Sequence, residues 1–148
     1  MGQSLSQILI HIIFSTKNRE AMITSEIQND LYSYLSSVCK NHNSKCYKIG
    51  GTKDHVHIAC DLPRTITISQ FILELKSHSS KWMKTKCQPK FSWQNGYGVF
   101  SLGYSQLPIL INYIDKQHQH HKKKSFKEEL VEFYKKYSVE YNEEYLWN

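Results

Sequence analysis

The sequence has no hydrophobic run long enough to cross a membrane. Its most apolar stretch near the N-terminus is ILIHIIF, residues 8–14, whereas a membrane-spanning helix needs about 20 apolar residues. Nothing that resembles a signal-peptide cleavage site follows this stretch. We therefore expect no membrane segment and no export signal, and we predict a cytoplasmic protein.

Cysteine pairs at a metal-binding spacing are also absent. The four cysteines form no C-x-x-C pair, so reduced thiols in a cytoplasmic protein are the expected state: Cys39, Cys46, Cys60 and Cys87. The chain has no internal repeat, and its one compositionally biased segment is HQHHKKK, residues 118–124. These absences argue against a disulfide-stapled domain and against a repeat array.

The composition favours one folded domain. The chain has 148 residues, of which 40% are hydrophobic and 13% aromatic, enough for one compact core. We predict a single domain over residues 1–148. The formal net charge of +6 makes a polyanion a reasonable partner without identifying it.

Hydrophobic patterns predict strands and helices in the order β-α-β-β-α-β. Strands are predicted within residues 6–19, 45–51, 55–62 and 97–103, and helices over 24–42 and 67–86. This order is typical of the α+β ferredoxin-like (split βαβ) fold, a four-stranded antiparallel sheet with two helices on one face. We expect the other face to be open. This core should comprise about residues 1–106, followed by C-terminal helices in about 107–148, at 105–125 and 125–138.

Local signals predict details of these helices. Thr24 or Ser25 is expected to cap the first helix, and Ser125 the last. The second long helix is expected to bury one apolar stripe, made of Ile68, Phe71, Ile72, Leu75 and Trp82.

Two histidines lie one residue apart in the predicted strand 55–62. Side chains at i and i+2 of a strand point to the same face, so His55 and His57 converge while Val56 points away. Two converging imidazoles can bind a metal. Ordinary sheet histidines satisfy the same spacing, so the pair alone leaves both interpretations open.

The predicted helix 105–125 carries a polar stripe. Tyr113, Gln117 and His121 follow one another at i, i+4 and i+8, which places them on one helix face. Ile111 and Ile114 supply the core-facing residues of the same helix. A single tyrosine is most often at the surface or partly in the core, and only its combination with the histidine pair favours a functional role for Tyr113.

Several separate blocks of the sequence resemble one known family. In chain order they are FSTKNRE, GGTKDHVHIACDLP, FILELKSHSSKWM, FSWQNGYGVFSLGYSQ and YIDKQHQHHKKKSFKEELVEFYKKY. Together they resemble the single-tyrosine HUH transposases of bacterial and archaeal insertion sequences, of which the REP-associated tyrosine transposases are close relatives. HUH denotes His, a hydrophobic residue and His, matched by residues 55–57.

The resemblance implies an enzyme that cuts and rejoins single-stranded DNA at insertion-sequence ends, which carry hairpins, through a 5′-phosphotyrosine intermediate. It also implies a divalent metal. His55 and His57 match the family's metal-binding histidines, Tyr113 matches the nucleophile, and Gln117 matches the third metal ligand. His121 matches no assigned position, so its approach to the metal is a separate hypothesis. Mixed nitrogen and oxygen ligands are compatible with Mg²⁺ and Mn²⁺ and do not by themselves exclude Zn²⁺. We expect Mg²⁺ or Mn²⁺ because reversible phosphoryl transfer benefits from a labile, open coordination sphere.

Basic and aromatic residues are candidates for DNA contacts. Phosphates are the expected partners of Lys76, Lys81, Lys84, Lys86 and Lys122 to Lys124, and unpaired bases of Trp93, Tyr97 and Phe100. Lysine runs are more often solvated faces and aromatic side chains more often core, so the residue types alone do not decide.

Two other functions fit part of the pattern. A non-catalytic or domesticated nucleic-acid-binding relative would share the fold, but binding alone needs no nucleophile. A two-histidine phosphoesterase would need a second H-x-S motif, for which HSS at His78 is the candidate. Because His78 falls in a predicted helix, this alternative is the weakest.

The resemblance and the sequence together predict a homodimer. Family members work as dimers with shared active sites. The segment GYSQLP, residues 103–108, is hinge-like, and the apolar strand 97–103 is a candidate sheet edge at which two chains can pair. We therefore expect Tyr113 of one subunit to serve His55 and His57 of the other.

Overall fold

The protein is built on one four-stranded antiparallel sheet. The computed structural model describes residues 2–86, 88–117 and 124–140. The strands are β1 (Leu9–Ser15), β2 (Cys46–Gly51), β3 (His55–Asp61) and β4 (Gly98–Leu102), in the spatial order β2-β3-β1-β4. This is the ferredoxin-like topology predicted from the element order, and it places β3, with the two histidines, inside the sheet.

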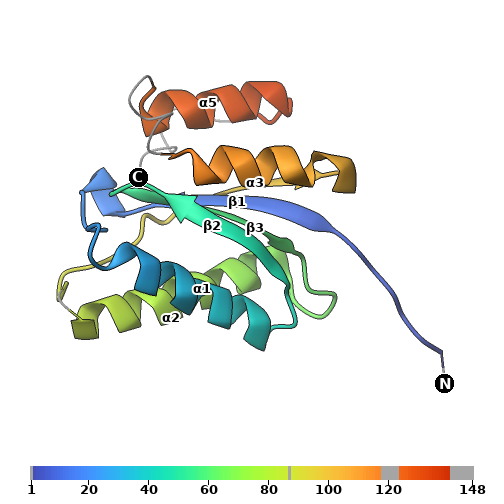
Figure 1. Ribbon diagram of the computed structural model, residues 1–148, viewed down its shortest axis with the longest axis horizontal. Coiled ribbons are helices and arrows are strands. Elements are labelled where there is room, and N and C mark those ends of the chain that lie inside the picture. Colours follow the sequence, from blue (N-terminus) through green and yellow to red (C-terminus); the bar gives the residue numbers. More distant parts are fainter. Residues whose placement is uncertain (1, 87, 118–123, 141–148) are drawn as a thin grey trace.

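Two long helices cover one face of the sheet. They are α1 (Gln28–Asn41) and α2 (Ile68–Lys86), which lie side by side below the sheet in Figure 1. Alternate strand residues such as Ile12, Phe14 and Ile58 point toward them and are almost fully buried. This layer is the main hydrophobic core, because it joins both helices to the two central strands.

The boundaries of these helices differ from the predicted details. Neither Thr24 nor Ser25 caps α1 through its side chain; instead, a turn in which the Thr24 carbonyl accepts the N–H groups of Ile27 and Gln28 precedes it. In α2 the predicted Ile68 is exposed and Trp82 is only partly buried, stacked on Tyr34. The last turns instead bury two residues that the stripe omitted, Ser79 and Met83.

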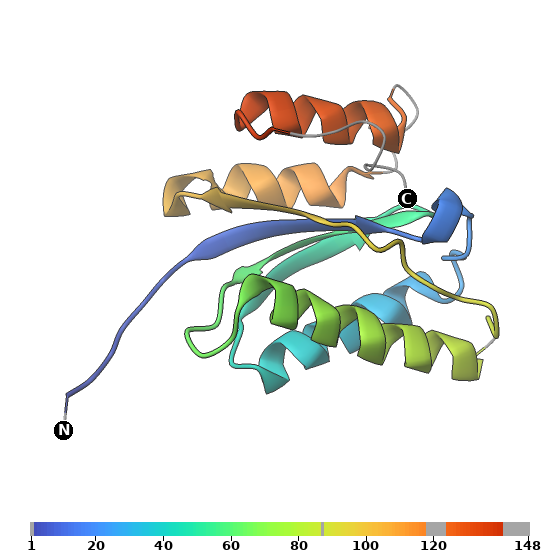
Figure 2. The same cartoon turned by 180° about the vertical axis from the view of Figure 1, so that it is seen from behind.

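The second face of the sheet is covered, contrary to the expectation of an open face. Two C-terminal helices, α3 (Leu107–Asp115) and α5 (Phe126–Lys136), lie on the side opposite to α1 and α2 (Figure 2). Helix α3 packs on β2 and β3, while Phe126 and Leu130 of α5 pack against Ile13 of β1 and Phe100 of β4. The strands present apolar residues on this face too, which is why it is buried.

Ser125 begins α5 as predicted, since its side chain accepts the N–H of Glu128. By contrast, the predicted continuous helix 105–125 is interrupted. A short 3-10 turn, η2 (Tyr104–Gln106), leads into α3, and Lys116 leaves helical geometry with φ −100° and ψ 21°. The N–H of Lys116 is shared between the carbonyls of Asn112 and Tyr113, the bonding of a tightened last turn. Gln117 is helical again.

A glycine allows α3 to lie close to the sheet. A Cβ atom at Gly50 of β2 would stand 2.7 Å from the carbonyl oxygen of Ile114 and 2.8 Å from its Cγ2. No larger residue fits that space without a shift of the helix, because both neighbours belong to the buried Ile114. Gly50 therefore determines how closely the last turn of α3, which carries Tyr113, approaches the sheet.

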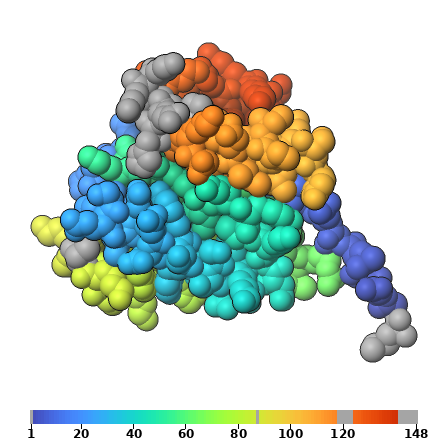
Figure 3. Space-filling view, viewed as in Figure 1, coloured from blue at the N-terminus to red at the C-terminus, as the bar shows by residue number. Residues whose placement is uncertain are grey.

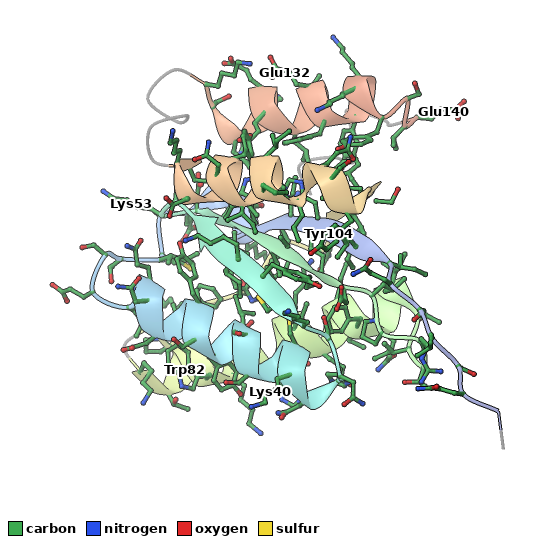
Figure 4. All side chains as sticks on the ribbon, turned by 45° about the vertical axis from the view of Figure 1, so that its right-hand side comes forward. Lys40, Lys53, Trp82, Tyr104, Glu132 and Glu140 are labelled. Carbon is green, nitrogen blue, oxygen red and sulfur yellow. The ribbon has the colours of Figure 1, made fainter. Side chains whose placement is uncertain are left out.

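Other parts of the chain lie away from this layer. Residues 2–7 extend from the body and are exposed (Figure 3). Trp82 and Lys40 lie on the α1 and α2 side, whereas Tyr104 and Glu132 lie beyond the other face (Figure 4). Cys39, Cys46 and Cys60 are free thiols, and Cys87 lies outside the described residues. Within the described part of the chain, no helix has the length and apolarity needed to span a bilayer.

Candidate active site

The two histidines of β3 point to the same face, as their spacing predicts. Both are fully buried, between the sheet and the α3 and α5 layer. Their rings lie 5.2 Å apart, centroid to centroid, with an interplanar angle of 70°. The strand backbone thus brings two imidazoles together beneath the C-terminal helices.

Gln117 lies directly above His55. Its Oε1 is 3.1 Å from Nε2 of His55, and the side chain is buried. Its amide Nε2 donates to Oε2 of Glu129 at 3.3 Å. Since the amide nitrogen is engaged by this carboxylate, the amide oxygen is the atom that faces the histidine, as a metal ligand requires.

Glu129 of α5 completes the cluster. One carboxylate oxygen, Oε1, is 3.0 Å from Nε2 of His57 and 3.7 Å from Nε2 of His55. The other oxygen, Oε2, accepts a hydrogen bond from the hydroxyl of Tyr113. Glu129 is 4% exposed, and a buried carboxylate persists only where charged or hydrogen-bonding partners compensate for lost hydration. The two histidines, the tyrosine and Gln117 are those partners.

The far nitrogens of both histidines are also engaged. Nδ1 of His55 donates to Oδ1 of Asp54 at 2.7 Å, and Nδ1 of His57 is 2.7 Å from Nε2 of His11, a buried residue of β1. Burial, and next the charge of His57, hold the pKa of His11 well below its usual value. Both Nδ1 atoms face outward partners, so both Nε2 atoms face the centre of the cluster.

This donor set fits a divalent cation. Ligand atoms of His55, His57 and Glu129 all lie within 4.8 Å of one another, and Oε1 of Gln117 adjoins them. When the Nδ1–H of a neutral His55 donates a hydrogen bond to Asp54, its Nε2 carries no proton and directs a lone pair at the Gln117 oxygen. Two lone pairs repel unless a proton or a cation lies between them. The residues present therefore suit a metal with mixed nitrogen and oxygen ligands.

Tyr113 lies at the edge of this cluster. Its ring meets the His57 ring edge-on at a centroid distance of 5.7 Å. Burial and then the adjacent Glu129 carboxylate raise the pKa of Tyr113. The phenol is therefore protonated at neutral pH, and it becomes a good nucleophile only if a base takes its proton or a cation offsets the carboxylate.

A cavity of about 330 Å³ leads to the tyrosine. It runs between α3 and α5, and Ile109, Leu110, Phe133, Tyr137 and Lys136 line its walls. Tyr113, His11 and Glu129 also line it. This cavity gives a substrate a route to the Tyr113 hydroxyl, whereas His55 and Gln117 lie deeper.

The predicted DNA contacts are largely elsewhere. Lys81, Lys84 and Lys86 are exposed on α2, across the sheet from Tyr113. Nζ of Lys76 donates to three carbonyls, those of Gln94, Asn95 and Gly96, and so holds the loop before β4. These lysines do not face the tyrosine.

The remaining candidates divide in the same way. Trp93 and Phe100 are core residues on opposite faces of the sheet, while Tyr97 is exposed. Lys124 pairs with Glu132 of α5, and Lys122 and Lys123 lie outside the described residues. His121 also lies outside them. His78 is in helix α2 and contacts Glu74, which leaves no strand-borne H-x-S motif at that position.

Two members of the cluster, His11 and Glu129, are absent from the sequence-based prediction. Each carried a detectable signal. His11 is an imidazole flanked by apolar residues within a buried strand, and Glu129 lies between Phe126 and Leu130 on the buried face of an amphipathic helix. Polar groups at core positions mark either a paired network or a functional site.

Comparisons with known proteins identify similar sequences. The family model described as "Transposase IS200 like" matches residues 4–117. The transposases for insertion sequence element IS200 of Salmonella typhimurium and Salmonella typhi are each 27% identical over 106 residues, covering 67% of this chain and 70% of the relative.

Solved structures are similar in fold. A proposed transposase from Deinococcus radiodurans R1 aligns with a TM-score of 0.63 at 21% identity, over 79% of this chain and 96% of that one. A REP-associated tyrosine transposase bound to a REP hairpin aligns with a TM-score of 0.60 at 15% identity, over 82% and 72% respectively.

Proposed function

Since the chain belongs to the IS200-like transposase family, we propose that it cuts and rejoins single-stranded DNA at insertion-sequence ends, with Tyr113 as nucleophile and a divalent metal as cofactor. One observation carries this proposal. The Tyr113 hydroxyl and the His57 imidazole bind the two oxygens of the same Glu129 carboxylate. The nucleophile and a metal-binding imidazole therefore lie next to the same carboxylate, as attack on a metal-bound phosphodiester requires.

The metal ligands in this proposal are His55, His57 and Gln117, joined by Glu129. Nε2 of each histidine, Oε1 of Gln117 and Oε1 of Glu129 face one centre. These hard and borderline donors suit Mg²⁺ or Mn²⁺. When bound, the metal would neutralise the charge of the scissile phosphate and offset the Glu129 carboxylate beside the tyrosine.

The residues of the chain supply the rest of the chemistry. The Tyr113 oxygen forms a bond to phosphorus, and the bond from phosphorus to the 3′ oxygen breaks. Oε2 of Glu129, which already accepts the phenol hydrogen, takes the proton, and the departing 3′ oxygen takes a proton from water. The products are a 5′-phosphotyrosine and a free 3′-hydroxyl.

The same step in reverse rejoins DNA. A 3′-hydroxyl from another strand end gives its proton to water as its oxygen bonds to phosphorus, and the tyrosine oxygen leaves with the proton held by Glu129. The phosphodiester energy is stored in the covalent link, so this exchange needs no ATP.

A single-stranded DNA hairpin is the proposed partner. One similar protein of known structure is bound to a REP hairpin, and its fold is shared by this chain. The cavity beside Tyr113, of about 330 Å³, has the volume of a pocket for a small group such as one nucleotide. Chromosomal DNA of a prokaryotic host lies in the cytoplasm, which is where we propose that the protein acts.

Sharing of active sites between two chains stays a prediction. Within one chain Tyr113 already lies against its own His57, so a shared site requires α3 to leave this position through the segment 103–106. Strand β4 is a sheet edge, as the predicted homodimer needs. Mixing a Tyr113→Phe protein with a His55→Ala/His57→Ala protein tests it. Cleavage restored in heterodimers supports sharing in trans, whereas inactive heterodimers contradict it.

The proposed function is tested with labelled single strands taken from the DNA that flanks the gene, chosen to include any imperfect palindromes found there. With Mn²⁺, the wild-type protein should give a protein–DNA adduct on a denaturing gel, and Tyr113→Phe should give none while binding the hairpin as before. An adduct in Tyr113→Phe would assign the nucleophile elsewhere. Hairpin binding without any wild-type adduct would favour a non-catalytic binding protein.

A further inference from the structure

A third imidazole lies directly behind His57. His11 of β1 faces Ala59 in the register with β3, so it is the diagonal neighbour of His57 on the same sheet face. The two rings stack with centroids 5.0 Å apart, and the Nε2 atom of His11 is 2.7 Å from Nδ1 of His57. Both neighbours of His11 on each side along the strand are apolar, as LIHIIFS shows, so a hydrophobic residue would pack there without this bond.

The two nitrogens of His57 have different partners. Nε2 faces Oε1 of Glu129 at 3.0 Å, and Nδ1 faces His11. A carboxylate oxygen only accepts hydrogen bonds. Without a metal, a neutral His57 therefore carries its proton on Nε2, and its Nδ1 accepts the Nε2 proton of His11. A metal on Nε2 requires the opposite tautomer, with the proton on Nδ1.

We propose that His11 is a positioning residue that lets His57 change tautomer when a metal binds, an inference that rests on the proposed metal site. His57 gives its Nε2 proton to Oε1 of Glu129, which passes it to water through the cavity that Glu129 lines. In the same exchange His57 receives the Nε2 proton of His11 on its Nδ1. His11 then takes a proton from water on its own Nδ1, so the pair keeps the same number of protons. Water reaches His11 through the cavity that it lines.

The imidazole of His11 allows its neighbour to change tautomer, which the carboxylate of Asp54 beside His55 does not. Asp54, 2.7 Å from Nδ1 of His55, can only accept, and the Thr52 hydroxyl, 2.9 Å from the same nitrogen, donates its proton to Asp54. Both neighbours therefore favour the tautomer with the proton on Nδ1. His11 donates to Nδ1 of His57 in one state and accepts from it in the other, because each neutral imidazole has one donor and one acceptor nitrogen. A buried apolar residue at position 11 can do neither.

Metal affinity in two matched variants tests the proposal. Glutamine and methionine have similar length and volume, but the amide is a strong donor and acceptor, whereas the thioether donates nothing and accepts only weakly. By calorimetric titration with MnCl₂, His11→Met should bind Mn²⁺ about 10- to 100-fold more weakly than wild type, and His11→Gln should stay within about threefold of it. Equal affinities of His11→Met and wild type, with both folded by thermal melting, would overturn the proposal.

A measurement on the wild-type protein covers the case in which the variants fail to fold. Ring-nitrogen NMR shifts identify the protonated nitrogen of each histidine. On addition of Mg²⁺, the proton of His57 should move from Nε2 to Nδ1, and that of His11 likewise. An unchanged His11 tautomer in the Mg²⁺-loaded protein would overturn the proposal.

The proposed function and this inference fail in different ways. If wild type and His57→Ala bind Mn²⁺ equally weakly, the metal site itself is wrong. If wild type binds Mn²⁺, His57→Ala does not, and His11→Met matches wild type, only the role of His11 is wrong.

Discussion

Replacement of Gly50 by alanine should disable the tyrosine by displacing the helix that carries it. The added Cβ would stand 2.7 Å from the Ile114 carbonyl oxygen, where ordinary contacts begin at 3.4 Å. The clash involves backbone, so a side-chain rotation cannot relieve it. The last turn of α3 must move away from β2 by roughly 0.7 Å, at a cost of about 1–3 kcal/mol in folding free energy.

The effect on cleavage should exceed the effect on stability. Tyr113 is the residue before Ile114, and its hydroxyl is held by Glu129 of another helix. A misplacement of about 1 Å in a reacting group costs on the order of 100-fold in rate. We therefore expect Gly50→Ala to lower the single-turnover cleavage rate by about 10- to 100-fold, measured with the labelled strand on denaturing gels.

Gly96→Ala is the matched control. A Cβ atom at Gly96 meets nothing within 4 Å, so the same chemical change should leave both the urea unfolding free energy and the cleavage rate at wild-type values. If Gly50→Ala behaves like Gly96→Ala in both measurements, α3 does not lie on Gly50 in the active protein, and the description of the site is wrong.

Two further predictions concern the metal ligands and a half-buried lysine. His55→Ala and His57→Ala should each eliminate cleavage at all practical metal concentrations, while Gln117→Ala should be milder because an amide oxygen is the weaker ligand; normal cutting by the histidine variants would mean that the histidines are structural. Burial lowers the pKa of Lys76 from 10.5 to about 8, so between pH 8 and pH 10.5 the unfolded chain binds more protons than the folded one. Stability measured by urea unfolding should therefore rise over that window relative to Lys76→Met, and a constant difference between the two proteins would contradict this assignment.

Local patterns predicted the elements that depend on near neighbours. The hairpin of β2 and β3, the convergence of His55 and His57, and the Ser125 cap all follow from spacings of a few residues. The strand order then follows from the split βαβ arrangement. These features were predictable because short-range geometry determines them.

Features that depend on packing between distant segments were missed. Glu129 is 72 residues from His57 in the chain, and an amphipathic pattern does not say which surface its helix covers. The same limit explains the sheet face predicted to be open and the interruption of the helix at Lys116. Lys76 was missed for the same reason. Together with the other lysines of its helix it was interpreted as part of a solvated or DNA-binding surface, whereas its ammonium donates to three carbonyls of a distant loop.

The most direct test of the account is to locate the covalent link between protein and DNA. The wild-type protein is incubated with Mn²⁺ and a single-stranded hairpin substrate, digested with protease and nuclease, and analysed by mass spectrometry. The account predicts one modified peptide, with the 5′-phosphate of the cleaved strand on Tyr113, and its loss in His57→Ala. A link to any other tyrosine, or cleavage by the wild-type protein without a protein-bound nucleotide, would contradict the central claim.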